Sequence, residues 1–169
     1  GEGLIGIGEL HPDTQGLDIT NKRIMEPVMT PALALEIPVV IHSSEPVGHS
    51  YPGKGNTTPD KLIALINNFP ENKIICAHWG GGLPFYALMP EVNRDLKNVY
   101  FDTAATPFLY DQRIFNLVSS LTNPGRILLA SDYPLISHRR VSGQLDESSL
   151  DARQKSDILG GNAKILLNL

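Results

Sequence analysis

The chain lacks most features that mark secreted, membrane-bound or nucleic-acid-binding proteins. Cys76 is the single cysteine among 169 residues, so no disulfide framework can form within the chain. No apolar run approaches the length of about 20 residues that a membrane-spanning helix needs. The net charge of −4, without a lysine or arginine cluster, argues against nucleic-acid or membrane-surface partners. The first residues are typical of a buried strand rather than a signal peptide, so we expect a cytoplasmic protein with a small-molecule substrate.

Five short apolar runs alternate with helical patterns along the chain. The runs are rich in Ile and Val and bounded by turn residues, which is typical of strands buried on both faces in a parallel sheet. They end at or next to Glu9, His42, His78, Asp102 and Asp132. Helical apolar spacing covers residues 24–36, 58–69, 84–96, 107–121 and 148–159. We expect Pro27 and Pro31 to kink or divide the first helix. The alternation predicts five βα units with parallel strands and right-handed crossovers.

The number of units bears on the fold class. A closed (β/α)₈ TIM barrel has eight units and roughly 250 residues. The chain opens inside a strand without a preceding element, so we interpret residues 1–169 as a single partial TIM-barrel domain of α/β class. It would comprise strands 4 to 8 with their helices, and the first three units would be absent. The alternative is a complete small open α/β sheet. A partial barrel alone would expose two open sheet edges, which favours aggregation.

Four polar residues close apolar runs: Glu9, His42, His78 and Asp132. The C-terminal ends of parallel barrel strands converge on one mouth, where active sites lie. A lone His or Asp at a strand end is commonly structural, but four such residues at the same end favour a functional site. Imidazole and carboxylate together suit Zn²⁺ and, less selectively, Mn²⁺, Fe²⁺ or Co²⁺. Asp132 could ligate the metal and accept a proton, and His78 could orient a metal-activated water or protonate a leaving group.

Five motifs appear in order along nearly the whole chain. They are IHSSE at residues 41–45, AHWGGGLPFY at 77–86, VYFDTAA at 99–105, SDYP at 131–134 and GGNA at 160–163. Together they resemble the amidohydrolase superfamily, and within it the amidohydrolase-2 group of metal-dependent TIM-barrel hydrolases. The resemblance implies that His42 is the fifth-strand metal ligand and His78 the sixth-strand histidine. It further implies that Asp132 is the eighth-strand aspartate and that Glu9 is the fourth-strand acidic residue used by some relatives to bridge two metals.

One feature of that family is missing from the sequence. The family's first strand carries a His-x-His pair that supplies two ligands, and no such pair occurs in these 169 residues. By resemblance, the chain therefore carries half of a metal site. It could be a fragment completed by the N-terminal part of the same protein, a chain whose missing strands come from elsewhere, such as another copy in a homo-oligomer, or a degenerate relative. We favour the fragment.

Other residues near the strand ends are weaker candidates. We predict contacts to substrate for Glu45, Tyr51, Lys54, Trp79 and Tyr86. The first three belong to a long loop, residues 43–57, which could equally be a solvated loop shaped by Pro and Gly. The two aromatic residues of the 77–86 motif could equally pack in the core. Asp102 could orient a ligand imidazole through a hydrogen bond. His11 and His138 are expected to be surface residues.

Three functions are compatible with this sequence. The first is a metal-dependent hydrolase that uses a metal-activated water on an amide, lactone or related C–N or C–O bond. The second is a metal-dependent non-oxidative decarboxylase of the same family, in which one residue delivers a proton to carbon. The third, motivated by the missing His-x-His pair, is a catalytically silent binding module.

Overall fold

A parallel five-stranded sheet forms the centre of the computed structural model, which describes residues 3–169. The strands are β1 (Ile7–Leu10), β2 (Val39–Ile41), β3 (Ile74–Cys76), β4 (Val99–Asp102) and β5 (Ile127–Leu128). They pair in sequential order, β1-β2-β3-β4-β5, and every pairing is parallel. Successive barrel strands have this order, whereas a doubly wound sheet reverses direction at a switch point. The described part of the chain thus has the topology of consecutive barrel units.

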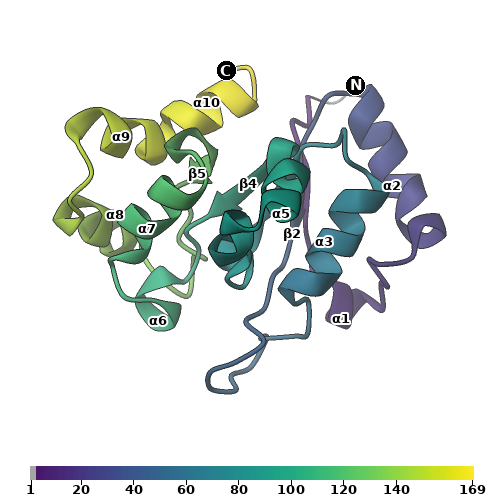
Figure 1. The fold of residues 1–169 in the computed structure, drawn as a ribbon, viewed down its shortest axis with the longest axis horizontal. Coiled ribbons are helices and arrows are strands. Elements are labelled where there is room, and N and C mark those ends of the chain that lie inside the picture. The colour runs from purple at the N-terminus through teal and green to yellow at the C-terminus, as the bar shows by residue number, and fades with distance from the viewer. Residues whose placement is uncertain (1–2) are drawn as a thin grey trace.

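Helices connect the strands and cover the sheet (Figure 1). Their bounds are α1 (Pro12–Gln15), α2 (Lys22–Ala34), α3 (Pro59–Asn68), α4 (Ala77–Gly80), η1 (Leu83–Leu88), α5 (Pro90–Asp95), η2 (Leu96–Asn98), α6 (Thr106–Leu109), α7 (Ile114–Leu121), η3 (Pro124–Arg126), α8 (His138–Glu147), α9 (Ala152–Ser156), η4 (Asp157–Gly161) and α10 (Asn162–Leu166). Among residues 3–169, no helix combines the length and apolar character that crossing a membrane requires.

Several helical segments differ from the sequence-based expectation. The helix α2 is continuous through Pro27 and Pro31 rather than divided. Both prolines are exposed, so their missing N–H groups fall on the solvent side while the buried side of the helix packs on the core. The expected helix over residues 107–121 is two shorter helices, α6 and α7, and that over 84–96 is divided into η1, α5 and η2. The helix expected over 148–159 begins only at Ala152, as α9, and continues into η4. The helix α8 was not predicted, because only Val141 and Leu145 are buried among its ten residues, too few for a clear apolar period.

The two faces of the sheet carry separate hydrophobic clusters. Strand side chains alternate between faces. One set, including Ile41, Cys76 and Phe101, joins the large cluster formed with the helices. The other set, including Ile75 and Leu128, forms a small cluster in which Leu166 of α10 is the third buried member. Most of the buried hydrophobic side chains therefore lie between the sheet and the helices. Packing against this layer of helices holds the strand ends in place.

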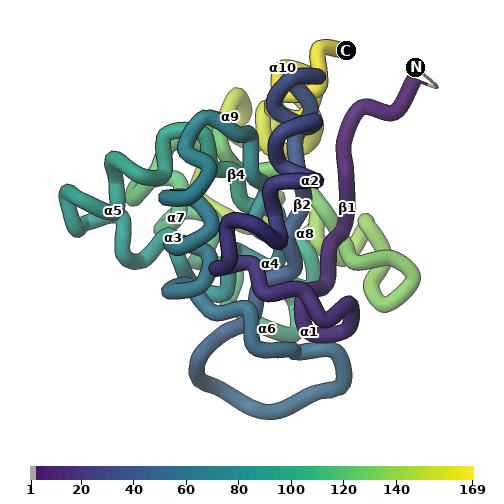
Figure 2. Tube along the Cα trace, turned by 90° about the vertical axis from the view of Figure 1, so that its right-hand side faces the viewer, coloured from purple at the N-terminus to yellow at the C-terminus, as the bar shows by residue number. Residues whose placement is uncertain are grey.

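The connections that follow the strands gather at one end of the molecule. The helices α1 and α6 and residues 43–57 lie at the lower end in both views, whereas α10 lies at the upper end (Figures 1 and 2). Residues 43–57 form a wide loop that projects beyond the rest of the chain (Figure 2). The strands thus deliver their C-terminal ends, and the polar residues that follow them, to this lower end.

The large cluster can be tested with two phenylalanines of opposite exposure. Phe115 of α7 is fully buried and meets Trp79 edge-on at a centroid separation of 5.1 Å. We expect Phe115→Ala to lower the free energy of unfolding by about 3–5 kcal/mol, because the substitution leaves a cavity in the core. Phe85 is 43% exposed, and Phe85→Ala is expected to cost about 1 kcal/mol or less. Urea unfolding followed by circular dichroism measures both, and equal losses would contradict this account of the core.

Candidate metal centre

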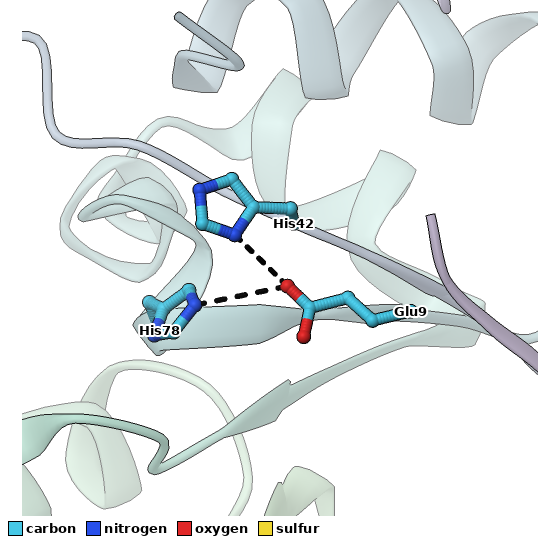
Figure 3. A group of neighbouring side chains, drawn as sticks. All are labelled: Glu9, His42 and His78. Carbon is cyan, nitrogen blue, oxygen red and sulfur yellow. Dashed lines mark hydrogen bonds and ion pairs between the residues drawn. The ribbon is translucent and has the colours of Figure 1, made fainter. Parts of the chain in front are cut away.

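Three side chains from consecutive strand ends converge on one point (Figure 3). Glu9 lies within β1, His42 directly follows β2, and His78 lies two residues beyond β3. One potential ligand atom from each residue lies within 4.8 Å of the other two. The structure thus brings together three of the four strand-end residues that the sequence singled out. The fourth, Asp132, lies outside this group but lines the same pocket.

A bulge in β1 aims Glu9 at the two imidazoles. Ile7 pairs with Val39 and Leu10 pairs with Ile41, so β1 uses one more residue than β2 between these two pairings. Such an extra residue bends a strand and redirects the side chain beside it. Gly8 makes the bend compatible with close strand packing, because it has φ +130° and an added Cβ would lie 2.6 Å from the carbonyl oxygen of Val40.

Both imidazoles point a ring nitrogen at the same carboxylate oxygen. Nδ1 of His42 lies 2.9 Å from Oε1 of Glu9, and Nε2 of His78 lies 3.7 Å from it. The rings meet edge-on at a centroid separation of 4.8 Å. Both histidine side chains are buried, whereas the Glu9 side chain is 37% exposed. The group is therefore accessible to a small ligand from the Glu9 side.

The remaining ring nitrogens face backbone carbonyls. Nε2 of His42 lies 3.0 Å from the oxygen of Lys54, and Nδ1 of His78 lies 3.2 Å from the oxygen of Ala104. A carbonyl only accepts, and a neutral imidazole has one N–H to donate. When that N–H serves the carbonyl, the nitrogen facing Glu9 carries a lone pair beside a carboxylate. A cation between these three groups satisfies all of them, and metal-binding histidines commonly donate their second N–H in this way.

The charges of the group shift the pKa values of its members in opposite directions. Burial by itself raises the pKa of Glu9, but the hydrogen bond with His42 and the charge interactions with both histidines lower it to about 2. Burial lowers the pKa of His78, but the Glu9 carboxylate at 3.7 Å and the charges of Asp102 and Asp132 raise it to about 9. The metal-free chain thus concentrates negative charge around His78, which also favours a bound cation.

Asp102 supports the backbone that presents His78. Its Oδ1 accepts hydrogen bonds from the backbone N–H groups of His78, at 2.9 Å, and Ala104, at 3.0 Å. His78 and Trp79 both have left-handed backbone conformations, with φ of 53° and 57°. Such conformations are uncommon for residues other than glycine and need support from their surroundings. Asp102 therefore binds the backbone N–H of His78, whereas the imidazole of His78 contacts the backbone carbonyl of Ala104.

A pocket of about 660 Å³ lies over the three residues. It is lined by Glu9, His11, His42, His49, Tyr51, Pro52, Gly53, His78, Ala105, Phe108, Leu109, Asp132 and Leu135. Tyr51 is the one residue among the five predicted substrate contacts that belongs to this lining. Its hydroxyl donates to Oε2 of Glu45 at 3.0 Å, and burial raises the pKa of Tyr51 above its usual range. The pocket therefore has a polar floor, formed by Glu9, His42 and His78, and largely apolar walls.

The other predicted substrate contacts lie outside the lining. Lys54 directs its ammonium at two carbonyls of its own loop. Trp79 is fully buried and donates to Oγ1 of Thr106 at 2.9 Å. Tyr86 is exposed on η1. The structure thus places Trp79 in the core and Tyr86 on the surface.

His11 belongs to the site although it was expected to be a surface residue. Its half-buried ring stacks on that of His42, with a centroid separation of 4.1 Å and an interplanar angle of 17°. Both ring nitrogens are engaged: Nε2 lies 3.1 Å from the oxygen of Gly53 and Nδ1 lies 2.9 Å from Oγ1 of Thr14. No strand spacing marks His11, because β1 ends at Leu10 and His11 is the N-cap residue of α1. His138 is exposed, as expected.

The fold and the site together define a TIM-barrel type of protein with a candidate metal centre at its strand ends. The sequence profile of the amidohydrolase family matches residues 1–169. The chain therefore belongs to the amidohydrolase family, specifically the amidohydrolase-2 group, as its motifs predicted. A search of curated proteins gives no significant match.

Solved structures share the fold of the chain. A dihydroxybenzoic acid decarboxylase from Polaromonas sp. JS666, with bound manganese and the inhibitor 2-nitroresorcinol, matches with a TM-score of 0.73 and 20% identity over 90% of this chain and 56% of its own. A candidate amidohydrolase from Staphylococcus aureus matches with a TM-score of 0.71 and 24% identity over 92% and 62%. A TIM-barrel protein from Bordetella bronchiseptica matches with a TM-score of 0.66 and 18% identity over 88% and 52%.

The chain corresponds to only part of each of these proteins. It spans between 52% and 62% of their length. With the sequential parallel sheet, they confirm the prediction of a partial TIM barrel. At sequence identities between 18% and 24%, these matches show a shared fold and no more.

The charge arrangement predicts how metal binding depends on pH. The carboxylates of Glu9, Asp102 and Asp132 hold the pKa of His78 at about 9, above its ordinary value of 6.5, so a metal that uses this imidazole must displace a proton at neutral pH. We expect metal affinity to rise with pH until about 9. In the metal-free protein, the stabilisation from protonated His78 should be complete below pH 6.5 and lost as the pH rises through about 9.

A histidine NMR titration of metal-free protein measures this pKa directly. Glu9→Gln should lower the pKa of His78, because the substitution removes the carboxylate that stabilises the imidazolium. Glu71→Gln, at an exposed position outside the pocket, is the matched control. Titration of wild-type His78 near 6.5, or an equal shift in both variants, would contradict the proposed coupling. Calorimetric titration with Mn²⁺ or Zn²⁺ at several pH values then measures the dependence of affinity.

Proposed function

We propose that this chain provides the catalytic site of a metal-dependent hydrolase acting on an amide, lactone or related C–N or C–O bond. One observation carries the proposal: two buried imidazoles each face a backbone carbonyl with one nitrogen and the Glu9 carboxylate with the other. This group lies at the C-terminal strand ends, where TIM-barrel enzymes carry their chemistry. Membership of the amidohydrolase family supports the same reaction class.

The residues present fit a divalent metal. Glu9, His42 and His78 offer one carboxylate and two imidazoles, a set that suits Zn²⁺, Mn²⁺, Fe²⁺ or Co²⁺. Three protein ligands with a further open position are typical of catalytic rather than structural metal sites. Manganese is bound in the Polaromonas decarboxylase, which shares this fold, and zinc remains our first choice for a site with two imidazoles. A metal bound there supplies Lewis acidity and lowers the pKa of a coordinated water to about 7.

Residues of this chain would bind the metal, transfer protons and line the pocket. Within this proposal Glu9 and His42 hold the metal, and the third ligand is either His78 or Asp132. Nε2 of His78 lies in the same group as the other two ligands, which favours His78. If Asp132 is the third ligand, His78 is left to orient the reacting water or protonate the leaving group. Asp132 lines the pocket and is the carboxylate available to accept a proton. Tyr51 contributes a hydroxyl to the wall.

A second candidate function is non-oxidative decarboxylation of a carboxylated aromatic or unsaturated acid. The pocket walls favour it, because Tyr51, Phe108, Leu109 and Leu135 would receive a flat apolar ring. The fold is also that of the dihydroxybenzoic acid decarboxylase. In such a reaction the bond between the ring and the carboxylate breaks, CO₂ leaves, and the electron pair remaining on the ring carbon takes a proton from a protein residue. His78 and Asp132 are the nearby groups able to deliver it.

Substrate assays separate these two functions. Purified protein loaded with Zn²⁺ or Mn²⁺ is incubated with lactones and, separately, with hydroxybenzoates. Hydrolysis releases the hydroxy acid from the lactone, and this is the outcome we expect. Release of CO₂ from hydroxybenzoate, with the lactone left intact, would replace the hydrolase by the decarboxylase. Tight stoichiometric metal without either reaction would favour a silent binding module.

His42→Ala tests the metal centre itself. We expect metal affinity to fall by at least about 100-fold, because the variant loses one of three ligands. His138→Ala, an exposed histidine of α8, is the matched control and should bind metal like the wild type. Calorimetric titration measures both. Unchanged affinity in His42→Ala would rule out the proposed centre.

A further inference from the structure

Residues 43–57, the pocket loop, are tied together at their two ends. The backbone N–H of Ser44 donates to the oxygen of Thr57 at 2.9 Å, and the N–H of Thr57 donates to Oγ of Ser44 at 3.2 Å. Between these ends the loop projects from the molecule (Figure 2). It carries His49 and Tyr51 into the pocket lining. The position of this loop therefore decides the shape of one pocket wall.

Two successive carbonyls of the pocket loop hold two stacked imidazoles. The oxygen of Gly53 lies 3.1 Å from Nε2 of His11, and the oxygen of Lys54 lies 3.0 Å from Nε2 of His42. The hydroxyl of Ser44 also donates to the oxygen of Lys54. Because the carbonyl of Lys54 draws the N–H of His42 to Nε2, it leaves Nδ1 free for the group formed with Glu9. The loop backbone thus sets which nitrogen of His42 faces the metal centre.

The side chain of Lys54 braces the same loop from within. Its ammonium donates to the carbonyl oxygens of Val47, at 2.8 Å, and His49, at 3.1 Å. It also lies 5.7 Å from the centroid of the Tyr51 ring. Lys54 therefore joins the outer part of the loop to the peptide that contacts His42. Its charge is engaged by these carbonyls, and Lys54 does not line the pocket.

Asp13 braces the loop from outside the pocket. Its Oδ2 accepts from the N–H of Asn56 at 2.7 Å and from Oγ1 of Thr57 at 3.4 Å. Gly55, with φ +67°, allows this close approach, since an added Cβ would lie 2.8 Å from the Asp13 carboxylate. The contacts of Lys54 and Asp13 thus fix the loop on both sides of the Lys54 carbonyl that contacts His42.

We propose that Lys54 is a positioning residue that couples the pocket loop to the metal centre. The proposal rests on the proposed function, since it assumes that His42 binds a metal. Order in the loop favours the ring orientation that binds metal, and bound metal in turn favours the ordered loop that places His49 and Tyr51. Such coupling is reciprocal in binding free energy.

Lys54→Met tests the coupling because it keeps the length of the stem and removes the ammonium. We expect metal affinity to fall about 10-fold, as for other groups that orient a metal ligand. Lys54→Arg should restore most of the affinity. Lys73→Met is the matched control, because Lys73 also donates to a backbone carbonyl, that of Glu36, but outside the pocket. Calorimetric titration with Mn²⁺ or Zn²⁺ measures all four proteins, and circular dichroism checks that they are folded.

Hydrogen exchange of the loop amides provides a second readout that needs no activity. Metal should slow exchange across residues 53–57 in the wild type and much less in Lys54→Met. If Lys54→Met does not fold, Asp13→Ala releases the same loop from an exposed position and should also weaken metal binding. Wild-type affinity in Lys54→Met, with unchanged loop protection, would overturn the coupling and leave the proposed function intact. Failure of the wild type to bind metal would overturn both.

Discussion

The site depends on one carboxylate shared by two imidazoles. Glu9 lies 2.9 Å from His42 and 3.7 Å from His78, and each ring is anchored on its far side by a backbone carbonyl. Anchoring fixes where each neutral ring donates its N–H and therefore directs its second nitrogen at the same carboxylate oxygen. In the metal-free protein a proton on His78 supplies the positive charge between these groups, and a metal cation that displaces this proton satisfies the carboxylate and both imidazoles together.

The anchors come from segments other than those that carry the ligands. His78 is held through the carbonyl of Ala104 and through Asp102, both at the end of β4, and His42 is held by Lys54 in the pocket loop. Each ligand therefore depends on a neighbouring βα connection. Sequential parallel strands make this natural, because the connection after one strand lies beside the end of the next. The large cluster between sheet and helices keeps those ends in register.

The sequence predicted the strand ends well and the supporting contacts poorly. Glu9, His42 and His78 were found because buried parallel strands have a clear apolar pattern and their ends must converge. His11 was missed because the bulge and the stacking on His42 arise from tertiary contacts that leave no periodic signal. Lys54 was predicted to contact substrate, and its contact to His42 was missed because it is made by a backbone carbonyl, which every residue possesses. Helix α8 was missed because its apolar face is too short.

The position of Glu9 is the most sensitive part of this arrangement. Among the described strands, β1 pairs only with β2, and the bulge that aims Glu9 lies within that single pairing. A shift of one residue in β1 would turn Glu9 to the other face, because strand side chains alternate. Gly8 resists such a shift, since no other residue fits so close to the carbonyl of Val40. Edge strands are the least constrained part of a sheet. The carboxylate that the two imidazoles share is therefore carried by an edge strand of the described sheet and depends on one strand pairing for its position.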